Sequence, residues 1–210
     1  GLQLTSYYAT SLSIGLDSGS LYLSMNMSDQ TGSFRYCKVR AIEKEPLLKG
    51  EPSKWLDFWG MQNADGSPAF GLLPANTYGT PGIEYFISAV SNGGEINIWN
   101  LAVQQSGPVL QRRTVATAPY SAAPDALQGN GKPAVDTGDT RFLSAVFRNG
   151  LLWAVHTVAA DWGDEVRAGI EWFIINPGAG RIVQHRVYGQ PGADYFSPAL
   201  MADGKGNISL

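Results

Sequence analysis

A hairpin pattern that recurs along the chain is the feature of this sequence that most restricts its fold. Four segments each consist of an alternating apolar and polar run, a short Gly-containing turn and a second alternating run, which is the pattern of a β-hairpin. Gly and Asn supply the positive φ that such turns require. The segments are Ser11–Met27, Tyr85–Leu101, Arg141–Val158 and Tyr195–Leu210, with expected turns at Asp17-Ser18-Gly19, Asn92-Gly93-Gly94, Arg148-Asn149-Gly150 and Asp203–Gly206.

The spacing of these turns indicates a repeat. Asn92, Asn149 and Asp203 are separated by 57 and 54 residues, whereas Asp17 and Asn92 are separated by 75. The longer first interval indicates an insertion, which we place within Glu43–Pro68. This stretch contains a short helical turn at residues 46–49, followed by a loop-like region rich in Pro, Gly, Asn and Asp.

A repeat of this length with about four strands per unit favours a β-propeller over a β-sandwich, because a sandwich predicts no sequence echo between units. A low charged fraction of 16%, with 25 Gly and 12 Pro, also fits many short strands and turns. We therefore expect an all-β, propeller-like fold with about three four-stranded blades and the first hairpin of a fourth. The expected units of this single domain, 1–210, are residues 7–80, 84–135, 140–190 and 194–210.

Composition and charge exclude several classes of partner. A net charge of −3 argues against nucleic acid, which is bound through clustered basic residues. No apolar run reaches the roughly 18 residues of a membrane span. The single cysteine, Cys37, allows no internal disulfide and lies in an alternating run, where we expect it to be buried as a packing residue.

The phrases "YYATSLSIGLDSGSLYLSMNM", "WGMQNADGSPAF", "DTGDTRFLSAVFRNGLLWAVHTV" and "DYFSPALMADGKGNISL" resemble a family of secreted bacterial proteins with propeller-type repeats and no assigned activity. This resemblance implies an extracellular location and further blades beyond Leu210. The "ADGKGNISL" hairpin is also similar to the Asp-box turns of sialidases, although it lacks their Ser-x-Asp start and closing Trp.

The loops of the third unit provide the candidate site. If the strand "RFLSAVF" is innermost, the loops before it and after "LLWAVHTV" emerge on one face and form a shared rim. Carboxylates with an Arg, a His and an exposed Trp suit a sugar or a hard cation such as calcium, and we expect no other cofactor. The alternative is solvated loop charge and turn capping. The rim residues are Asp136, Asp139, Arg141, His156, Asp161, Trp162 and Asp164.

The six tryptophans divide by context. Trp99, Trp153 and Trp172 lie in alternating strands and are expected in the core. The other three lie in regions that read as loops and are better candidates for ligand contact; they are Trp55, Trp59 and Trp162.

Two functions remain open from the sequence. The first is a non-catalytic extracellular module that binds a glycan or a protein, or associates with copies of itself. Its support is the repeat and the absence of a phosphate-binding loop, a nucleophile elbow or a zinc pattern. Self-association would use the strand edge near Ile208 and Leu210, which carries no charge or proline. The alternative is a glycoside-active enzyme, in which two of the four rim aspartates would provide the required pair of carboxylates.

Overall fold

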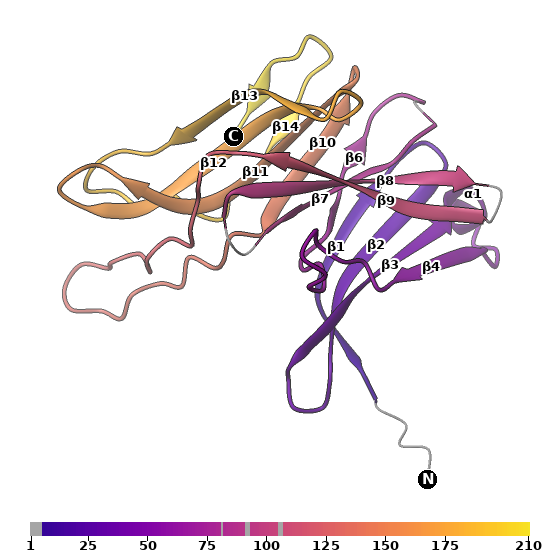
Figure 1. The fold of residues 1–210 in the computed structure, drawn as a ribbon, viewed down its shortest axis with the longest axis horizontal. Coiled ribbons are helices and arrows are strands. Elements are labelled where there is room, and N and C mark those ends of the chain that lie inside the picture. Colours follow the sequence, from indigo (N-terminus) through magenta and orange to yellow (C-terminus); the bar gives the residue numbers. More distant parts are fainter. Residues whose placement is uncertain (1–5, 81, 91–92, 105–106) are drawn as a thin grey trace.

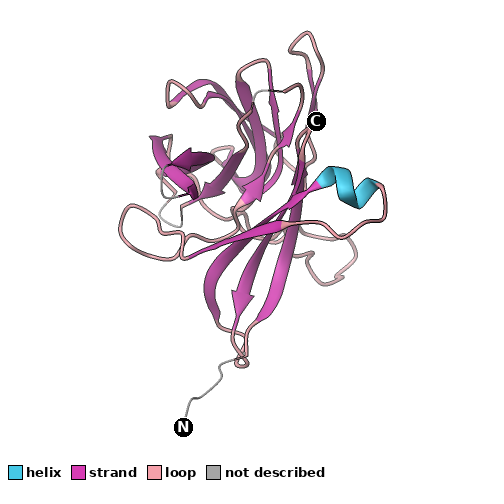
Figure 2. Ribbon diagram, turned by 90° about the vertical axis from the view of Figure 1, so that its right-hand side faces the viewer, coloured by secondary structure: helices cyan, strands magenta, loops and turns pink. Residues whose placement is uncertain are grey.

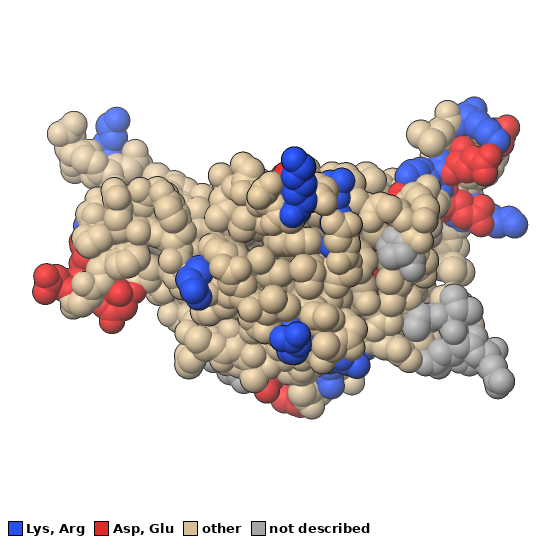
Figure 3. Space-filling model, turned by 90° about the horizontal axis from the view of Figure 1, so that it is seen from above, with Lys and Arg blue, Asp and Glu red and all other residues tan. Residues whose placement is uncertain are grey.

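The protein is all-β in the computed structural model, which describes residues 6–80, 82–90, 93–104 and 107–210. Figure 1 shows two wings of antiparallel strands, with the early strands in one wing and the late strands in the other, joined by a middle group. Among the described residues, no helix is long and apolar enough to cross a membrane. From above, charged side chains are sparse, and the acidic ones gather mainly at the two ends of the long axis (Figure 3).

The first sheet is an antiparallel meander of four strands. It confirms the expected hairpin at Asp17, whose Oδ1 accepts the backbone N–H groups of Gly19 and Ser20 and closes the turn. The short helix α1 (Lys44–Leu48) follows the third strand, where a helical turn was expected, and appears as the cyan coil in Figure 2. The strands are β1 (Tyr8–Leu16), β2 (Ser20–Ser28), β3 (Phe34–Glu43) and β4 (Trp55–Trp59).

The strand β4 differs from the sequence-based interpretation, which placed Trp55 and Trp59 in a loop-like insertion. The segment Trp-Leu-Asp-Phe-Trp is instead a strand, which pairs with β3 through Ala41↔Leu56 and Val39↔Phe58. Both tryptophans therefore project from one face of a sheet.

The second sheet supplies three strands from its own unit, one fewer than expected, because residues 117–141 form no long strand. Its hairpin pairs Phe86 with Trp99 and Ile87 with Ile98. The predicted turn residue Asn92 lies outside the described residues. The strands, in spatial order, are β5 (Leu73–Pro74), β7 (Tyr85–Ala89), β8 (Glu95–Gln104) and β9 (Gly107–Ala116).

The third sheet is a complete four-stranded meander, as expected, with its first turn at Asn149 and Gly150, both at positive φ. A two-stranded hairpin follows and is shorter than the segment predicted for it. The strands of the third sheet are β10 (Phe142–Arg148), β11 (Leu151–Asp161), β12 (Val166–Asn176) and β13 (Arg181–Tyr188), and those of the hairpin are β14 (Met201–Ala202) and β15 (Ile208–Ser209).

A two-residue strand, β6 (Asn76–Thr77), joins the first and third sheets. It pairs in parallel with β1 at Leu16↔Asn76 and with β10 at Val146↔Asn76. The two meanders thus form one nine-stranded ladder, in which β1 and β10 are the strands nearest the junction. The first strands of the two units therefore lie close together, each flanking the same short segment.

The sheets are stacked face to face in chain order, with an apolar core between each neighbouring pair. The first core joins Tyr22 and Val39 of the first sheet to Phe86 and Trp99 of the second, and includes the buried Cys37. The second contains Ile87, Ile96 and Ile98 with Ala145, Phe147, Leu152 and Phe173, and the third contains Val146, Trp153 and Val155 with Leu200, Ala202 and Ile208.

Three five-residue turns in the described part of the chain share one backbone pattern, and only the last of them lies at a predicted hairpin tip. The first residue, Asp or Asn, donates its N–H to the carbonyl of the fifth at 2.8–3.0 Å. The fourth residue is always Gly, with φ between 83° and 85°, a conformation that a Cβ would disfavour. Local hydrogen bonds thus close each of these turns. They span residues 29–33, 63–67 and 203–207.

A carboxyl group is buried beside β6. Glu84, just before β7, accepts a hydrogen bond at Oε2 from Thr77 Oγ1 at 2.7 Å, and its Oε1 has no partner among the described residues. Burial raises the pKa of Glu84 to about 9. The side chain is therefore a neutral carboxylic acid at pH 7.

Candidate functional site

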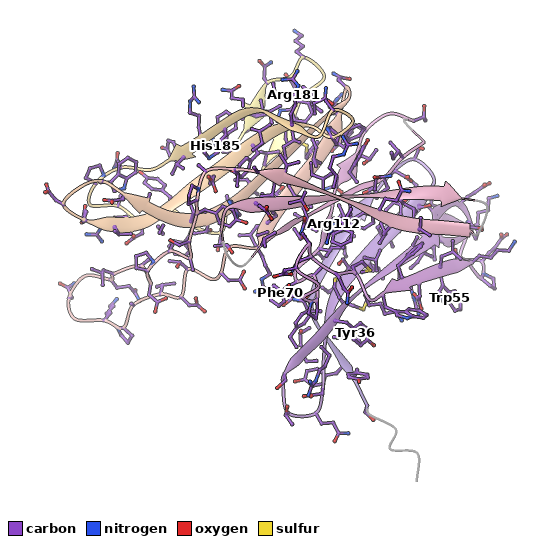
Figure 4. All side chains as sticks on the ribbon, viewed as in Figure 1. Tyr36, Trp55, Phe70, Arg112, Arg181 and His185 are labelled. Atoms are coloured by element: carbon purple, nitrogen blue, oxygen red, sulfur yellow. The ribbon has the colours of Figure 1, made fainter. Side chains whose placement is uncertain are left out.

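A cleft of about 560 Å³ lies where connecting segments of all three sheets meet, and we call it the junction cleft. The segment before β10 contributes one wall, and the residues that follow β9 contribute the floor. Figure 4 shows Phe70 between the two wings of the molecule. The side chains that define the cleft are Phe34, Asn63, Phe70, Tyr120, Asp139 and Arg141.

Arg141 is the most constrained cation in the cleft. Its Nε donates to Asp139 Oδ1 at 2.7 Å, and the same oxygen accepts the Arg141 backbone N–H at 2.9 Å. Its Nη1 donates to Ser11 Oγ on β1 at 2.7 Å, and its guanidinium carbon lies 5.2 Å from the centre of the Phe70 ring. A cation–π contact and two hydrogen-bond partners thus fix the guanidinium across the junction between the first and third sheets.

Gly71 has no side chain and therefore leaves room for Arg141 to adopt this position. Its φ is +60°, and a Cβ at this position would lie 2.6 Å from both Cγ and Cδ of Arg141. The Gly71 N–H donates to Oδ1 of the buried Asn26 at 3.0 Å, which anchors the segment to β2. The glycine therefore positions Phe70 while leaving room for the arginine stem.

Aromatic rings form one wall and the floor. Phe34 and Phe70 are in edge-to-face contact with centroids 5.0 Å apart, and Phe70 remains 36% exposed. Tyr120 is buried, and its hydroxyl accepts the Val90 N–H at 2.9 Å and lies 2.7 Å from the Glu95 carbonyl. Burial raises the pKa of Tyr120 to about 12, so the floor stays uncharged.

A chain of side-chain amides fixes the polar wall. Asn63 Nδ2 donates to Ser67 Oγ at 3.0 Å, and Asn63 Oδ1 accepts from Asn97 Nδ2 at 2.9 Å. Asn97 Oδ1 in turn accepts from Thr114 Oγ1 at 2.7 Å on β9. Because each amide is held at both ends, the wall is ordered before any ligand arrives.

His156 was predicted at the rim but lies beneath the cleft and is fully buried. Its Nδ1 is 2.7 Å from the Thr140 carbonyl, so Nδ1 carries the hydrogen, and its Nε2 is 2.6 Å from Glu171 Oε2. Glu171 also binds His185 Nε2 through its other oxygen. Phe142 stacks on the His156 ring with centroids 4.5 Å apart. His156 therefore supports the backbone that presents Asp139 and Arg141.

The remaining predicted rim residues lie outside the junction cleft. Asp136 Oδ1 accepts the Gly138 N–H at 2.8 Å and belongs to a smaller neighbouring recess of about 160 Å³. Asp161, which is about 17 Å beyond His156 along β11, caps its own turn through the Gly163 N–H at 2.8 Å. Both aspartates therefore cap turns, as the alternative interpretation predicted.

The other two predicted residues share the turn after β11. Trp162 packs against Gly189, where a Cβ would come within 2.8 Å of the indole, and Asp164 is exposed. The structure thus gathers Asp139 and Arg141 into the cleft with His156 below them, and leaves Asp161, Trp162 and Asp164 apart.

Sequence reasoning missed four lining residues, Phe34, Asn63, Phe70 and Tyr120, because they come from the first and second units. The available signals were weak. An aromatic residue precedes Gly71 in a Pro- and Gly-rich segment, and Asn63 begins one of the three recurrent turns. No periodicity relates these positions to the third unit.

The cleft contains one carboxylate, Asp139, and that group is already paired with Arg141. Within the described ranges, no three His, Cys, Asp or Glu side chains gather in a way that could hold a metal ion. The arrangement can stack an apolar ring face on Phe70 and offer hydrogen-bonding groups at its edge. Comparison of the chain with family models, curated proteins and solved structures finds no match.

Proposed function

We propose that this protein is a non-catalytic, extracellular β-propeller module that binds a neutral glycan in the junction cleft. The observation that carries the proposal is the exposed Phe70 ring beside the fixed Arg141–Asp139 pair. A sugar has an apolar ring face and a polar edge, and such a wall offers a partner for each. Because the two charges balance, the cleft favours an uncharged saccharide over an acidic one.

The propeller part of the proposal is supported by the order and stacking of the sheets. Each sheet follows its predecessor in the chain and packs on it face to face, and β14–β15 begins a further layer on the third sheet. The strand β10 contacts both β7 and β14, so the first strands of successive units are neighbours. Radially arranged blades have this connectivity. The extracellular setting rests on the resemblance of the four hairpin phrases.

The glycosidase alternative is less well supported. Hydrolysis requires two carboxyl groups flanking the scissile bond, about 5 to 9.5 Å apart. Of the four aspartates considered for this role, only Asp139 lines the junction cleft. Asp136 and Asp161 cap their own turns. A binding role requires no second carboxylate.

Isothermal titration of the protein with a panel of neutral oligosaccharides tests the proposal. At least one should bind, and Phe70→Ala and Arg141→Ala should each weaken that binding by tenfold or more. Tyr188→Ala, which removes an exposed ring on β13, is the matched control and should leave the affinity unchanged. Absence of binding across the panel, or equal losses in all three variants, would contradict the proposal. Release of reducing sugar would favour the enzyme instead.

A further inference from the structure

The first sheet has an apolar face that points away from all three cores, and we call it the outer face. Residues paired directly across strands lie on the same side of a sheet, so the pairing register defines its rows. One row runs through Leu16, Leu21, Ile42 and Trp55, and the next begins with Ile14 and Leu23. Their neighbours along the strands, such as Tyr22 and Val39, point into the first core.

The outer face is unusually apolar for a solvated surface. Ile14 is 54% exposed, Trp55 is 57% exposed and Trp59 is 66% exposed, and Leu16 is also exposed. An antiparallel sheet with one solvated side normally alternates apolar inward and polar outward residues. This sheet is apolar on both sides, as a sheet covered on both sides would be. In Figure 4, Trp55 lies on β4 at the far end of the wing from Phe70.

Three charged residues lie among these side chains. Asp57 on β4 receives Arg40 Nε at 2.6 Å, Arg40 Nη2 at 2.8 Å and Lys38 Nζ at 2.9 Å. Arg40 also lies over the Trp55 ring, 5.2 Å from its centroid. Positive and negative groups are therefore adjacent to one another and to apolar side chains of the outer face.

We propose that the outer face binds the outer face of a second copy of this chain, forming a two-fold dimer through sheet-on-sheet packing. A two-fold axis presents the same patch to itself, so each patch must be its own complement. The adjacent positive and negative groups satisfy this condition, because the rotation can bring Asp57 of one copy toward Lys38 or Arg40 of the other. The apolar side chains of β1 and β2 then lie to one side of these charges, and Trp55 and Trp59 flank them along β4.

The size of the face fits such an interface. Three strands of nine or ten residues and the five-residue β4, about 4.8 Å apart, cover roughly 15 by 30 Å at their widest. Side-chain relief enlarges this footprint toward the roughly 800 Å² of accessible surface that each partner contributes to a standard interface. The aliphatic character of Ile14, Leu16 and Leu23 favours a protein surface over a polysaccharide, which would need hydrogen-bonding groups.

Analytical ultracentrifugation of the 210-residue chain over a wide concentration range tests the dimer. The mass should rise from 22.6 kDa to twice that value as concentration increases. Ile14→Lys and Trp59→Lys place a charge at exposed positions, so they should leave the fold intact and raise the dimer dissociation constant at least tenfold. Leu127→Lys and Tyr188→Lys are controls at exposed apolar positions elsewhere and should dimerise like the unmodified chain.

Several outcomes would overturn the proposal. A chain that stays monomeric at every concentration, or dimers that survive both outer-face substitutions, would exclude this interface. An open-ended series of larger species would exclude two-fold closure and indicate a head-to-tail contact. Circular dichroism and thermal melting establish that each variant is folded. As a second measurement, tryptophan emission of the unmodified chain should shift to shorter wavelength as the dimer forms, and the absence of a shift would count against it.

The outer face shares no residue with the lining of the junction cleft. Loss of dimerisation in Trp59→Lys with unchanged glycan binding is therefore the expected combination. Conversely, failure to find a glycan ligand leaves the dimer measurement unaffected.

Discussion

The guanidinium of Arg141 lies 5.2 Å from the centre of the Phe70 ring, and the two residues come from connecting segments of different sheets. The contact bridges the first and third sheets at the junction cleft. It depends on the absence of a side chain at Gly71, directly beneath the arginine stem.

Substitution of Gly71 by Ala should therefore displace Arg141. A Cβ would lie 2.6 Å from its Cγ and Cδ, and the positive φ adds backbone strain of roughly 1 kcal/mol. Gly60 has φ +74° with open space around it, so Gly60→Ala should lose stability only through backbone strain. Chemical denaturation should show a larger loss of stability for Gly71→Ala, accompanied by weaker glycan binding. Equal losses in both variants would mean that Arg141 moves aside freely.

The buried Glu84 should make stability fall as pH rises. Its folded pKa of about 9 is above its ordinary value of 4.5, so the folded state holds a proton that the unfolded state has released. This contribution is fully present below pH 4.5 and is lost as pH rises through about 9. Glu84→Gln should flatten the dependence of unfolding free energy on pH across this window. A profile identical to that of the unmodified chain would show that Glu84 is solvated.

Replacing Glu171 by Ala should lower the free energy of unfolding more than replacing His185 by Ala. Glu171→Ala leaves the fully buried His156 without its partner at Nε2, a kind of change that typically costs about 3 kcal/mol. The His185 side chain is 28% exposed, so water can replace part of what His185→Ala removes from Glu171. Urea denaturation of both variants gives the comparison. The reverse order would indicate that His185 carries the network.

Tyr120→Phe should lower the stability of the fold without weakening glycan binding. The substitution keeps the ring on the cleft floor but leaves the Val90 N–H without its hydroxyl acceptor, at a cost of about 1–3 kcal/mol. Tyr85→Phe is the matched control, because the Tyr85 hydroxyl has no hydrogen bond in the described part of the chain. Thermal melting should distinguish the two variants, while titration should find glycan affinity retained in both. A large loss of affinity in Tyr120→Phe would assign the hydroxyl a direct role.

The hairpins could be predicted from sequence because their turns are encoded locally. Asp17 closes its turn with its own side chain, and Asn149 and Gly150 adopt the positive φ that the composition indicates. Propeller closure stays a prediction. The strand at Trp55 was missed because both of its faces carry aromatic residues, which blurs the alternation between inside and outside.

The site was harder to predict because it forms only when three sheets stack. Asp139 and Arg141 are neighbours in sequence and were anticipated, whereas Phe34 and Phe70 reach them through packing that no local pattern encodes. His156 was placed on the rim because it lies near the expected end of its strand, before the loop at residues 159–165, but β11 continues to Asp161. Both faces of β11 are buried, so alternation could not distinguish rim from interior.

The stacking of the sheets also sets the order in which the molecule comes apart. The sheet of β7, β8 and β9 contributes to two cores at once, so it cannot open without disrupting both neighbours. The first sheet borders one core only, so it loses that contact face and its pairing with β6 when it opens, and it can detach first as a separate cooperative unit. Because the junction cleft draws its walls from all three sheets, detachment of the first sheet dismantles it. On warming, the protein therefore becomes unable to hold a ligand while its central sheet still protects its amide hydrogens from exchange.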